Sequence, residues 1–245
     1  MAEENRVNLR AHRSVHRVEQ TITGPAVDRE HRGYMDPRYW QGWIDAWNYL
    51  HALQAGAAAP KATQHALSAL TKEQWLAFYQ QLADYDATLD GAAPGGVRLN
   101  LGSGEIVLTN FINVDVYPHQ GTVAADLTKR WPWKDGSVDY VRASHIIEHL
   151  PDKIFTMNEL WRVLKDGGRC HISVPTTDGP GAWQDPTHVT FWNRRSFLYF
   201  EDGAPYHVAY AKSYGIVCRF GVFRERIDET PDGPILEITL TAVKS

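Results

Sequence analysis

The sequence predicts an α/β domain with a largely parallel, Rossmann-like sheet, preceded by a helical extension. Beyond residue 96, short apolar runs alternate with segments of helical periodicity, a pattern typical of βαβ units. The first run leads directly into a glycine-rich turn, and the last two resemble an antiparallel hairpin. With 245 residues, 43% of them hydrophobic and 22% charged, the chain can bury a full core.

The region before the sheet is predicted to consist of two parts. Residues 1–33 are charged and lack an apolar period, which predicts a polar N-terminal arm. Residues 34–95 are predicted to form a helical extension or lid, and Thr71 with Gln74 fits a capping box at its second helix. A Pro/Gly/Ala linker before residue 96 marks the boundary of the domain at 96–245. The first helix carries three aromatic side chains that either pack internally or line a substrate cleft: Trp40, Trp43 and Trp47.

Strands and one central helix can be assigned within residues 96–245. Asp152 is predicted to cap a helix that Gly167 and Gly168 end. A Pro/Asp/Gly turn separates the two hairpin strands, Phe220–Ile227 and Ile235–Val243. Five further runs are predicted strands: Val97–Leu101, Phe111–Val116, Thr122–Ala125, Val138–Ala143 and Cys170–Val174.

Charge and cysteine content narrow the functional classes. The net charge of −4 and the pI near 6.2 lack the basic footprint of a protein that binds a phosphate backbone, so no nucleic-acid partner is expected. The N-terminus has no apolar segment, which predicts no secretory signal and no membrane partner. Cys170 and Cys218 lie in strand-like runs and suit buried thiols in a reducing cytoplasm.

Two consecutive strand ends carry the first chemical signal. In RLNLGSGE, Gly102 and Gly104 lack side chains that would keep a ligand away from the backbone. The next strand, INVDV, places Asp115 at the carboxyl edge beside this turn, where a carboxylate can accept hydrogen bonds from ribose hydroxyls. Only about ten residues separate Gly104 from Asp115, too few for a full crossover helix, so NAD binding is disfavoured.

From residue 96 to about 200, the ordered motifs LNLGSG, FINVDV, ADLTKRWPWKDGSVDYVRASHIIEHL and LWRVLKDGGRCHISVP resemble the class I S-adenosylmethionine-dependent methyltransferases. The resemblance implies a seven-stranded sheet with its penultimate strand reversed and S-adenosylmethionine as the cofactor. The glycine turn would wrap the methionine, Asp115 would hold the ribose, and the remaining residues would contact the adenine or close the pocket. The cofactor residues implied in this way are Leu101, Gly102, Ser103, Gly104, Asp115, Asp126, Leu127, Ser144 and His145.

One position departs from the pattern of these methyltransferases. They often carry Asp or Glu two residues before the first glycine, where this chain has Asn100. An amide can still accept a hydrogen bond from an amine or a water, but it lacks the charge that would attract the methionine ammonium.

The loop of residues 174–197 is expected to lie over the ligand crevice and to select the methyl acceptor. Its DPTH run resembles a subgroup of methyltransferases, many of them associated with glycan pathways. Trp183 and Trp192 would either stack on a sugar or pack within the loop. The predicted substrate residues are Asp178, Trp183, Gln184, Trp192 and Asn193.

A hydroxyl acceptor benefits from a base, and His188 is the predicted one, because imidazole titrates near neutrality. Asp185 would orient it or bind the acceptor, and His149 would supply a further hydrogen bond; alternatively, Asp185 and His188 only tie down the loop. A metal held by His145 and His149 is disfavoured. A divalent cation such as Mg²⁺, held by Asp178, Asp185 or His188, stays open.

These inferences predict an O-methyltransferase that acts on a hydroxyl of a sugar, an oligosaccharide or a similar polar small molecule. The N-terminal helices would cover the site or form a homodimer over it. One alternative is an N-methyltransferase or a methyltransferase for a nonsugar metabolite. The other is a noncatalytic scaffold that retains cofactor binding.

Overall fold

The computed structural model describes residues 72–117, 119–230 and 232–244. The predicted arm, the helix with the three tryptophans and the cap at Thr71 lie outside these residues. The strands are β1 (Arg98–Leu101), β2 (Ile112–Asp115), β3 (Thr122–Ala124), β4 (Val138–Ser144), β5 (Leu164–Pro175), β6 (Phe220–Thr230) and β7 (Gly233–Ala242). The helices are α3 (Lys72–Leu89), the 3-10 turn η3 (Ile147–His149), α4 (Lys153–Val163), α5 (Gly181–Gln184), α6 (Arg194–Phe197) and α7 (Pro205–Tyr214).

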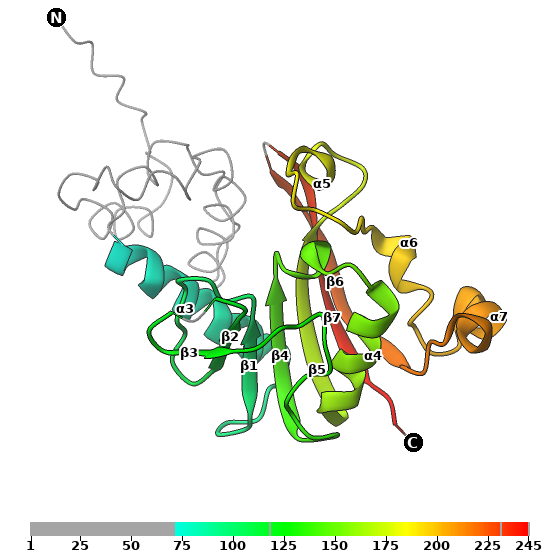
Figure 1. The fold of residues 1–245 in the computed structure, drawn as a ribbon, viewed down its shortest axis with the longest axis horizontal. Coiled ribbons are helices and arrows are strands. Elements are labelled where there is room, and N and C mark those ends of the chain that lie inside the picture. Colours follow the sequence, from blue (N-terminus) through cyan, green and yellow to red (C-terminus); the bar gives the residue numbers. More distant parts are fainter. Residues whose placement is uncertain (1–71, 118, 231, 245) are drawn as a thin grey trace, which may run out of the picture. The chain divides into compact units, whose positions relative to one another are not determined.

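The strands form one seven-stranded sheet in the order β3-β2-β1-β4-β5-β7-β6 (Figure 1). β1 to β5 are mutually parallel where they pair, while β7 runs antiparallel between β5 and β6. This confirms the predicted class I methyltransferase sheet with its reversed penultimate strand. The carboxyl ends of β1, β2 and β4 therefore meet at one edge, where ligands bind in such sheets.

The helix α4 covers the apolar face of the sheet. It begins after Asp152, whose side chain accepts a hydrogen bond from the Phe155 amide at 2.9 Å, so the predicted cap is confirmed. Its inward residues Met157 and Leu160 are fully buried in a core shared with every second residue of the central strands. The strand residues in this core include Leu99, Val141, Ile172 and Ile238.

The predicted end of this helix at Gly167 and Gly168 is wrong. α4 ends at Val163, and β5 starts immediately at Leu164. The register between β4 and β5 shifts between Val138 and Tyr140, and the extra residues of β5 fold into a turn in which Gly167 has φ 71°. The two glycines thus permit an irregularity in the strand rather than a helix end.

The opposite face of the sheet is polar, and the end of α3 packs against it. Asp90, just after α3, has no exposed surface, and three side chains from the sheet donate hydrogen bonds to it. These are the Tyr140 hydroxyl at 3.0 Å, Arg224 Nε at 2.6 Å and the Thr239 hydroxyl at 3.0 Å. The compact unit around the sheet accordingly spans Tyr79–Ser245. The boundary at residue 96 stays a prediction.

A buried ion pair lies next to Asp90 on the same face. His171 Nε2 lies 2.8 Å from a Glu237 oxygen, and both residues are buried. Burial alone would lower the pKa of His171, but Asp86 and Glu237 raise it above its ordinary value. Burial would likewise raise the pKa of Glu237, but His171 lowers it to about 2. Each of these shifts favours the charged form of its group.

This pair predicts a pH dependence of stability. Because the folded pKa of Glu237 is depressed, its contribution is complete above about pH 4.5 and is lost as the pH falls towards 2. The contribution of His171, whose pKa is raised, is complete below about pH 6.5 and is lost as the pH rises through the folded value. Urea unfolding of the parent and of Glu237→Gln should differ most between these limits; a constant difference from pH 3 to pH 9 would contradict the coupling.

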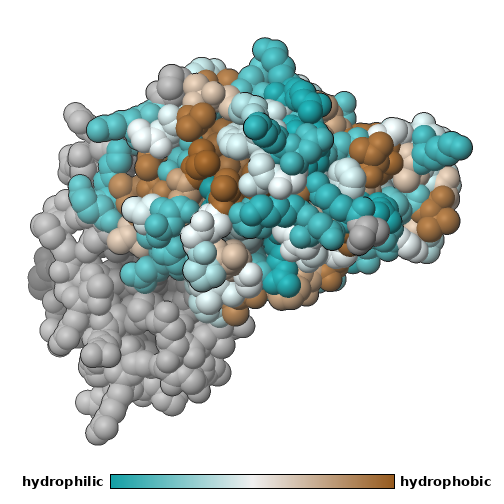
Figure 2. All heavy atoms as spheres, turned by 90° about the horizontal axis from the view of Figure 1, so that it is seen from below, coloured by the Kyte–Doolittle hydropathy of each residue, from teal (hydrophilic) through white to brown (hydrophobic). Residues whose placement is uncertain are grey.

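On the face that Figure 2 shows, hydrophilic residues cover most of the described surface, and hydrophobic residues form small groups between them. Among the described helices, none combines the length and the apolar character that crossing a bilayer requires.

Candidate active site at the carboxyl edge of the sheet

The turn after β1 can be formed only by glycine at its first position. Gly102 has φ 61°, and a Cβ atom there would lie 2.6 Å from Ile146 Cγ1. Gly104 also has a positive φ, of 51°, but the space around its missing side chain is open. Between them, the Ser103 amide donates to the Val114 carbonyl at 2.9 Å. The turn thus presses against β2 and the segment after β4, and it leaves backbone accessible at Gly104.

Asp115, the last residue of β2, lies directly beside this turn. One carboxylate oxygen accepts a hydrogen bond from the Gly104 amide at 2.8 Å, and the other accepts one from the Tyr117 amide at 3.0 Å. The side chain is half-buried, so its oxygens keep an open side. The structure therefore brings together the glycine turn and the acid, as the sequence predicts.

The side-chain nitrogen of Asn100 is engaged in hydrogen bonds within the protein. The residue is buried, and its amide nitrogen donates to the Ile106 carbonyl at 3.2 Å and to the Asn113 side-chain oxygen at 3.1 Å. Asn113 in turn bonds both the amide and the carbonyl of Leu108 at 2.9 Å. A carboxylate cannot donate these bonds, so the departure from an acid at this position has a structural cause.

The remaining predicted cofactor residues lie around the same edge. The Ala125 amide donates to the Asp115 carbonyl at 3.0 Å, which places Asp126 and Leu127 next to the end of β2. Hydrogen bonds from Lys129 and then from Thr128 lower the pKa of Asp126 to about 2. Leu127 is buried. The carboxylate at Asp126 is thus ionised, and it is already paired within its own turn.

Ser144 and His145 follow β4, as predicted. The His145 amide donates to the Ser173 carbonyl at 2.9 Å, which extends the pairing with β5. His145 has φ 51°, a conformation that is costly for a residue other than glycine and that concentrates at functional sites. The chain reverses here and enters η3.

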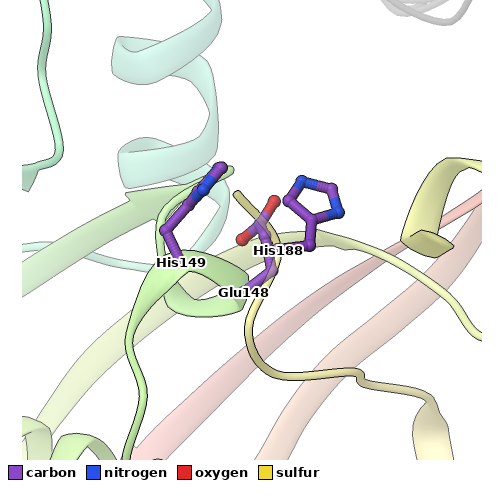
Figure 3. Close-up of side chains that lie close together, drawn as sticks. All are labelled: Glu148, His149 and His188. Carbon is purple, nitrogen blue, oxygen red and sulfur yellow. The ribbon is translucent and has the colours of Figure 1, made fainter. Parts of the chain in front are cut away.

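Three side chains converge just beyond this reversal. Glu148 and His149 come from η3, and His188 comes from the loop after β5 (Figure 3). One ligand-type atom of each lies within 4.8 Å of those of the others, and the Glu148 carboxylate lies between the two imidazoles (Figure 3). Glu148 and His188 are buried, and the two rings meet edge to face at 4.8 Å. We call Glu148, His149 and His188 the triad.

Backbone hydrogen bonds hold the loop against η3 and so bring the triad together. The amides of Val189 and Thr190 donate to the Glu148 carbonyl at 2.9 and 3.0 Å. The Thr190 hydroxyl donates to the Ile147 carbonyl at 3.0 Å. His188 is therefore fixed beside Glu148 by its neighbours in the chain.

Asp185 does not orient His188 in the predicted way. The closest approach, from Asp185 Oδ2 to His188 Nε2, is 3.9 Å, too long for a hydrogen bond. Asp185 Oδ1 instead accepts bonds from the Thr187 amide at 2.8 Å and the Thr187 hydroxyl at 2.6 Å. The Ala182 carbonyl, 3.1 Å from His188 Nδ1, orients the ring. Asp185 thus shapes the turn that carries His188.

The predicted substrate residues separate into two groups. Trp183 is 57% exposed and stacks on Phe191 with ring centroids 4.2 Å apart, while Asp178 and Gln184 are also exposed. Trp192 has no exposed surface and packs on Phe197, which contradicts a stacking role with a ligand.

Asn193 also has a structural role. Its side chain caps α6 through the Ser196 amide and donates to the Thr177 hydroxyl at 2.8 Å. Of the two tryptophans in the loop, only Trp183 is therefore exposed and able to contact a ligand.

The loop also contacts the tip of the β6–β7 hairpin. The Gly181 amide donates to the Asp232 carbonyl at 2.6 Å. A Cβ atom at Gly179 would lie 2.5 Å from Pro234, and one at Gly233 would lie 2.9 Å from the Gly179 Cα. α5 accordingly lies beside the hairpin tip (Figure 1).

Glu148 and Thr187 are residues of this site that the predicted roles omit. The signal for Glu148 was present in the Glu-His pair that follows β4, since a carboxylate next to a histidine at a sheet edge suits proton transfer or metal ligation. Thr187, whose hydroxyl lies 3.1 Å from His149 Nδ1, has no comparable signal in the sequence.

Residues 106–172 match the model of a family described as a methyltransferase domain. No curated protein sequence matches the chain. A chain of the Haloferax volcanii complex between the Trm112 methyltransferase activator and a methyltransferase is 17% identical, with a TM-score of 0.47, covering 71% of this chain and 96% of that one. The YcgJ protein of Bacillus subtilis is 12% identical, with a TM-score of 0.48 and coverages of 66% and 98%.

The 1,6-didemethyltoxoflavin-N1-methyltransferase of Burkholderia thailandensis, solved with S-adenosylhomocysteine, is 11% identical, with a TM-score of 0.48 and coverages of 86% and 92%. The family match covers the part of the chain from just after the glycine turn into β5. That match, the sheet order and the glycine turn beside Asp115 together support an S-adenosylmethionine-dependent methyltransferase.

Proposed function

We propose that this methyltransferase transfers the methyl group to a hydroxyl of a sugar, an oligosaccharide or a similar polar small molecule. The observation that carries the proposal is the triad at the edge where the cofactor binds. A hydroxyl is a poor nucleophile until its proton leaves, whereas an amine with a free electron pair needs no such help. A buried carboxylate with two imidazoles is a suitable proton acceptor.

Proximity between the cofactor turn and the triad supports this assignment. Gly102 abuts Ile146, and Ile146 is only two residues from Glu148. The residues expected to wrap the cofactor and the residues expected to activate the acceptor are therefore held in one packed unit. Methyl transfer depends on such alignment, because the acceptor oxygen must lie in line with the sulfonium methyl group.

The exposed surface of Trp183 supports a sugar-like acceptor. An indole stacked on Phe191 offers a rigid apolar platform of the kind on which the apolar face of a sugar packs. Asp178 and Gln184 are exposed in the same loop and can bond hydroxyl groups. Two buried free thiols, at Cys170 and Cys218, support the proposed cytoplasmic location.

In the simplest form of the mechanism, His188 Nε2 accepts the hydroxyl proton. The Ala182 carbonyl can only accept a hydrogen bond, so His188 Nδ1 carries a hydrogen and, in the neutral ring, Nε2 has a lone pair. We expect His188→Ala to lower kcat by about 10²- to 10⁴-fold, while the affinity for S-adenosylhomocysteine stays the same. Initial rates of S-adenosylhomocysteine release measure the first quantity and calorimetry measures the second.

A panel of acceptors tests the function itself. The full chain, S-adenosylmethionine and matched sets of glycans, other hydroxyl compounds and amines would be assayed for S-adenosylhomocysteine release. His119→Ala, at an exposed turn outside the triad, is the control variant. Turnover confined to amines would show an N-methyltransferase instead. Cofactor binding without turnover on any acceptor would favour the noncatalytic scaffold.

A further inference from the structure

We propose that the triad binds a divalent first-row transition-metal ion such as Zn²⁺ or Fe²⁺. Two imidazoles and one carboxylate are a common ligand set for these ions. The chain places Glu148, His149 and His188 with ligand-type atoms within 4.8 Å of one another. Ligand atoms about 2.0–2.2 Å from a common ion lie about 3–3.5 Å apart, so binding would draw the three side chains together.

The buried carboxylate is the first independent observation for a bound cation. Glu148 is 1% exposed, and neither of its carboxylate oxygens has a hydrogen-bond partner among the described residues. His145 Nδ1 lies 3.4 Å from one of them, at the distance of an ion-pair contact. A buried carboxylate without hydrogen bonds is costly unless a cation compensates it.

The tautomers of both histidines are the second observation. His188 Nδ1 lies 3.1 Å from the Ala182 carbonyl, and His149 Nδ1 lies 3.2 Å from the Thr187 carbonyl. Because a carbonyl only accepts, each Nδ1 carries a hydrogen, and in the neutral ring each Nε2 keeps a lone pair for a metal. Histidine ligands of metals typically donate their other ring N–H to a backbone carbonyl in this way. Nε2 of His188 has no hydrogen-bond partner among the described residues.

Thr187 and Asp185 support His149 through hydrogen bonds on the side of the ring away from the proposed metal. The Thr187 hydroxyl donates to Asp185 at 2.6 Å, so its oxygen can accept a hydrogen bond from His149 Nδ1, 3.1 Å away. This arrangement polarises the imidazole and makes it a better ligand. Asp185 therefore serves the proposed metal site through Thr187 rather than as a ligand.

The donor set argues against the Mg²⁺ that the sequence leaves open. Mg²⁺ prefers oxygen ligands in octahedral geometry, whereas two of the three groups here are nitrogen donors. Asp178 is exposed, and the described structure does not place it in the triad. Three protein ligands leave coordination positions open. If the proposed function holds, the acceptor hydroxyl would bind there and lose its proton more readily.

Co²⁺ is a direct probe, because its visible absorption reports nitrogen and oxygen ligation independently of methyl transfer. Titration of the metal-free full chain with Co²⁺ should reveal one binding site, from which Zn²⁺ displaces the Co²⁺ ion. Glu148→Gln and His188→Ala should each raise the Co²⁺ dissociation constant by at least about 100-fold. Thr187→Val, which removes only the outer hydroxyl, should raise it by about 10- to 100-fold. Calorimetry with S-adenosylhomocysteine would verify that each variant is folded.

His119→Ala controls for adventitious histidine binding and should leave the Co²⁺ affinity unchanged. Co²⁺ absorption that His188→Ala retains at the affinity of the parent would overturn the proposal, as would no absorption in the parent. Failure here is separable from failure of the proposed function. Methyl transfer to hydroxyl groups that depends on His188, in a chain that binds no Co²⁺, would overturn the metal site alone. A Co²⁺ site that depends on His188, in a chain that methylates only amines, would overturn the proposed function alone.

Discussion

Asp115→Ala is expected to raise the dissociation constant for S-adenosylhomocysteine by about 10- to 150-fold. Hydrogen bonds to a charged group contribute about 1.5–3 kcal/mol each, and the loss of one to a ribose hydroxyl accounts for this range. The substitution also leaves the Gly104 amide without the hydrogen bond that it donates to the Asp115 carboxylate at 2.8 Å. The effect therefore includes a less ordered glycine turn.

Isothermal titration calorimetry of the full chain would measure this change, and circular dichroism would verify the fold. Asp202→Ala, at an exposed acid near α7, is the matched control and should bind the ligand as the parent does. Equal affinity of Asp115→Ala and the parent would show that the glycine turn and the acid do not form the ribose site.

Asp90→Ala is expected to lower the free energy of unfolding by about 3–5 kcal/mol, the usual cost of breaking a buried ion pair from one side. Asp90 accepts bonds from Tyr140, Arg224 and Thr239, and all three would lose a partner. Arg224 keeps Asp86, whose Oδ1 lies 2.9 Å from it, so the guanidinium is not left entirely uncompensated.

Urea unfolding of the full chain followed by far-ultraviolet circular dichroism would measure the loss. Asp84→Ala is the control on the same helix, because Asp84 is only half-buried and its side chain accepts a bond from Gln80. Its change should stay within about 1 kcal/mol. A loss below 1 kcal/mol for Asp90→Ala would mean that α3 is not anchored through this residue.

The positions of the strands, and the apolar face that they form together, could be predicted closely. Runs such as those of β1 and β4 are bounded by turn residues, and the cap at Asp152 is a local signal that depends on residues three positions apart. The polar face is different. His171 and Arg224 find their partners only after the chain has folded back over 60 residues or more, so no local pattern indicates that α3 packs there.

The site shows the same division. The glycine turn and Asp115 are predictable, because parallel strands bring consecutive carboxyl ends together. The triad forms only because the loop after β5 returns to η3, 38 or more residues along the chain. Backbone hydrogen bonds to the Glu148 carbonyl hold the loop there, and such bonds leave no signal in the sequence. Trp183 and Trp192 lie in one loop with similar neighbours, and only the packing on Phe197 reveals that Trp192 belongs to the core.

The close meeting of Gly179, Gly181 and the hairpin tip has a consequence for how this enzyme could acquire a new substrate. No side chain fits at these contacts, since a Cβ atom would lie 2.5–2.9 Å from its neighbours. A longer or bulkier loop after β5 would therefore collide with the tip of the β6–β7 hairpin unless the tip changed with it. If the loop selects the acceptor as proposed, its shape and that of the hairpin tip are coupled, and we expect homologous enzymes with different acceptors to vary both segments together.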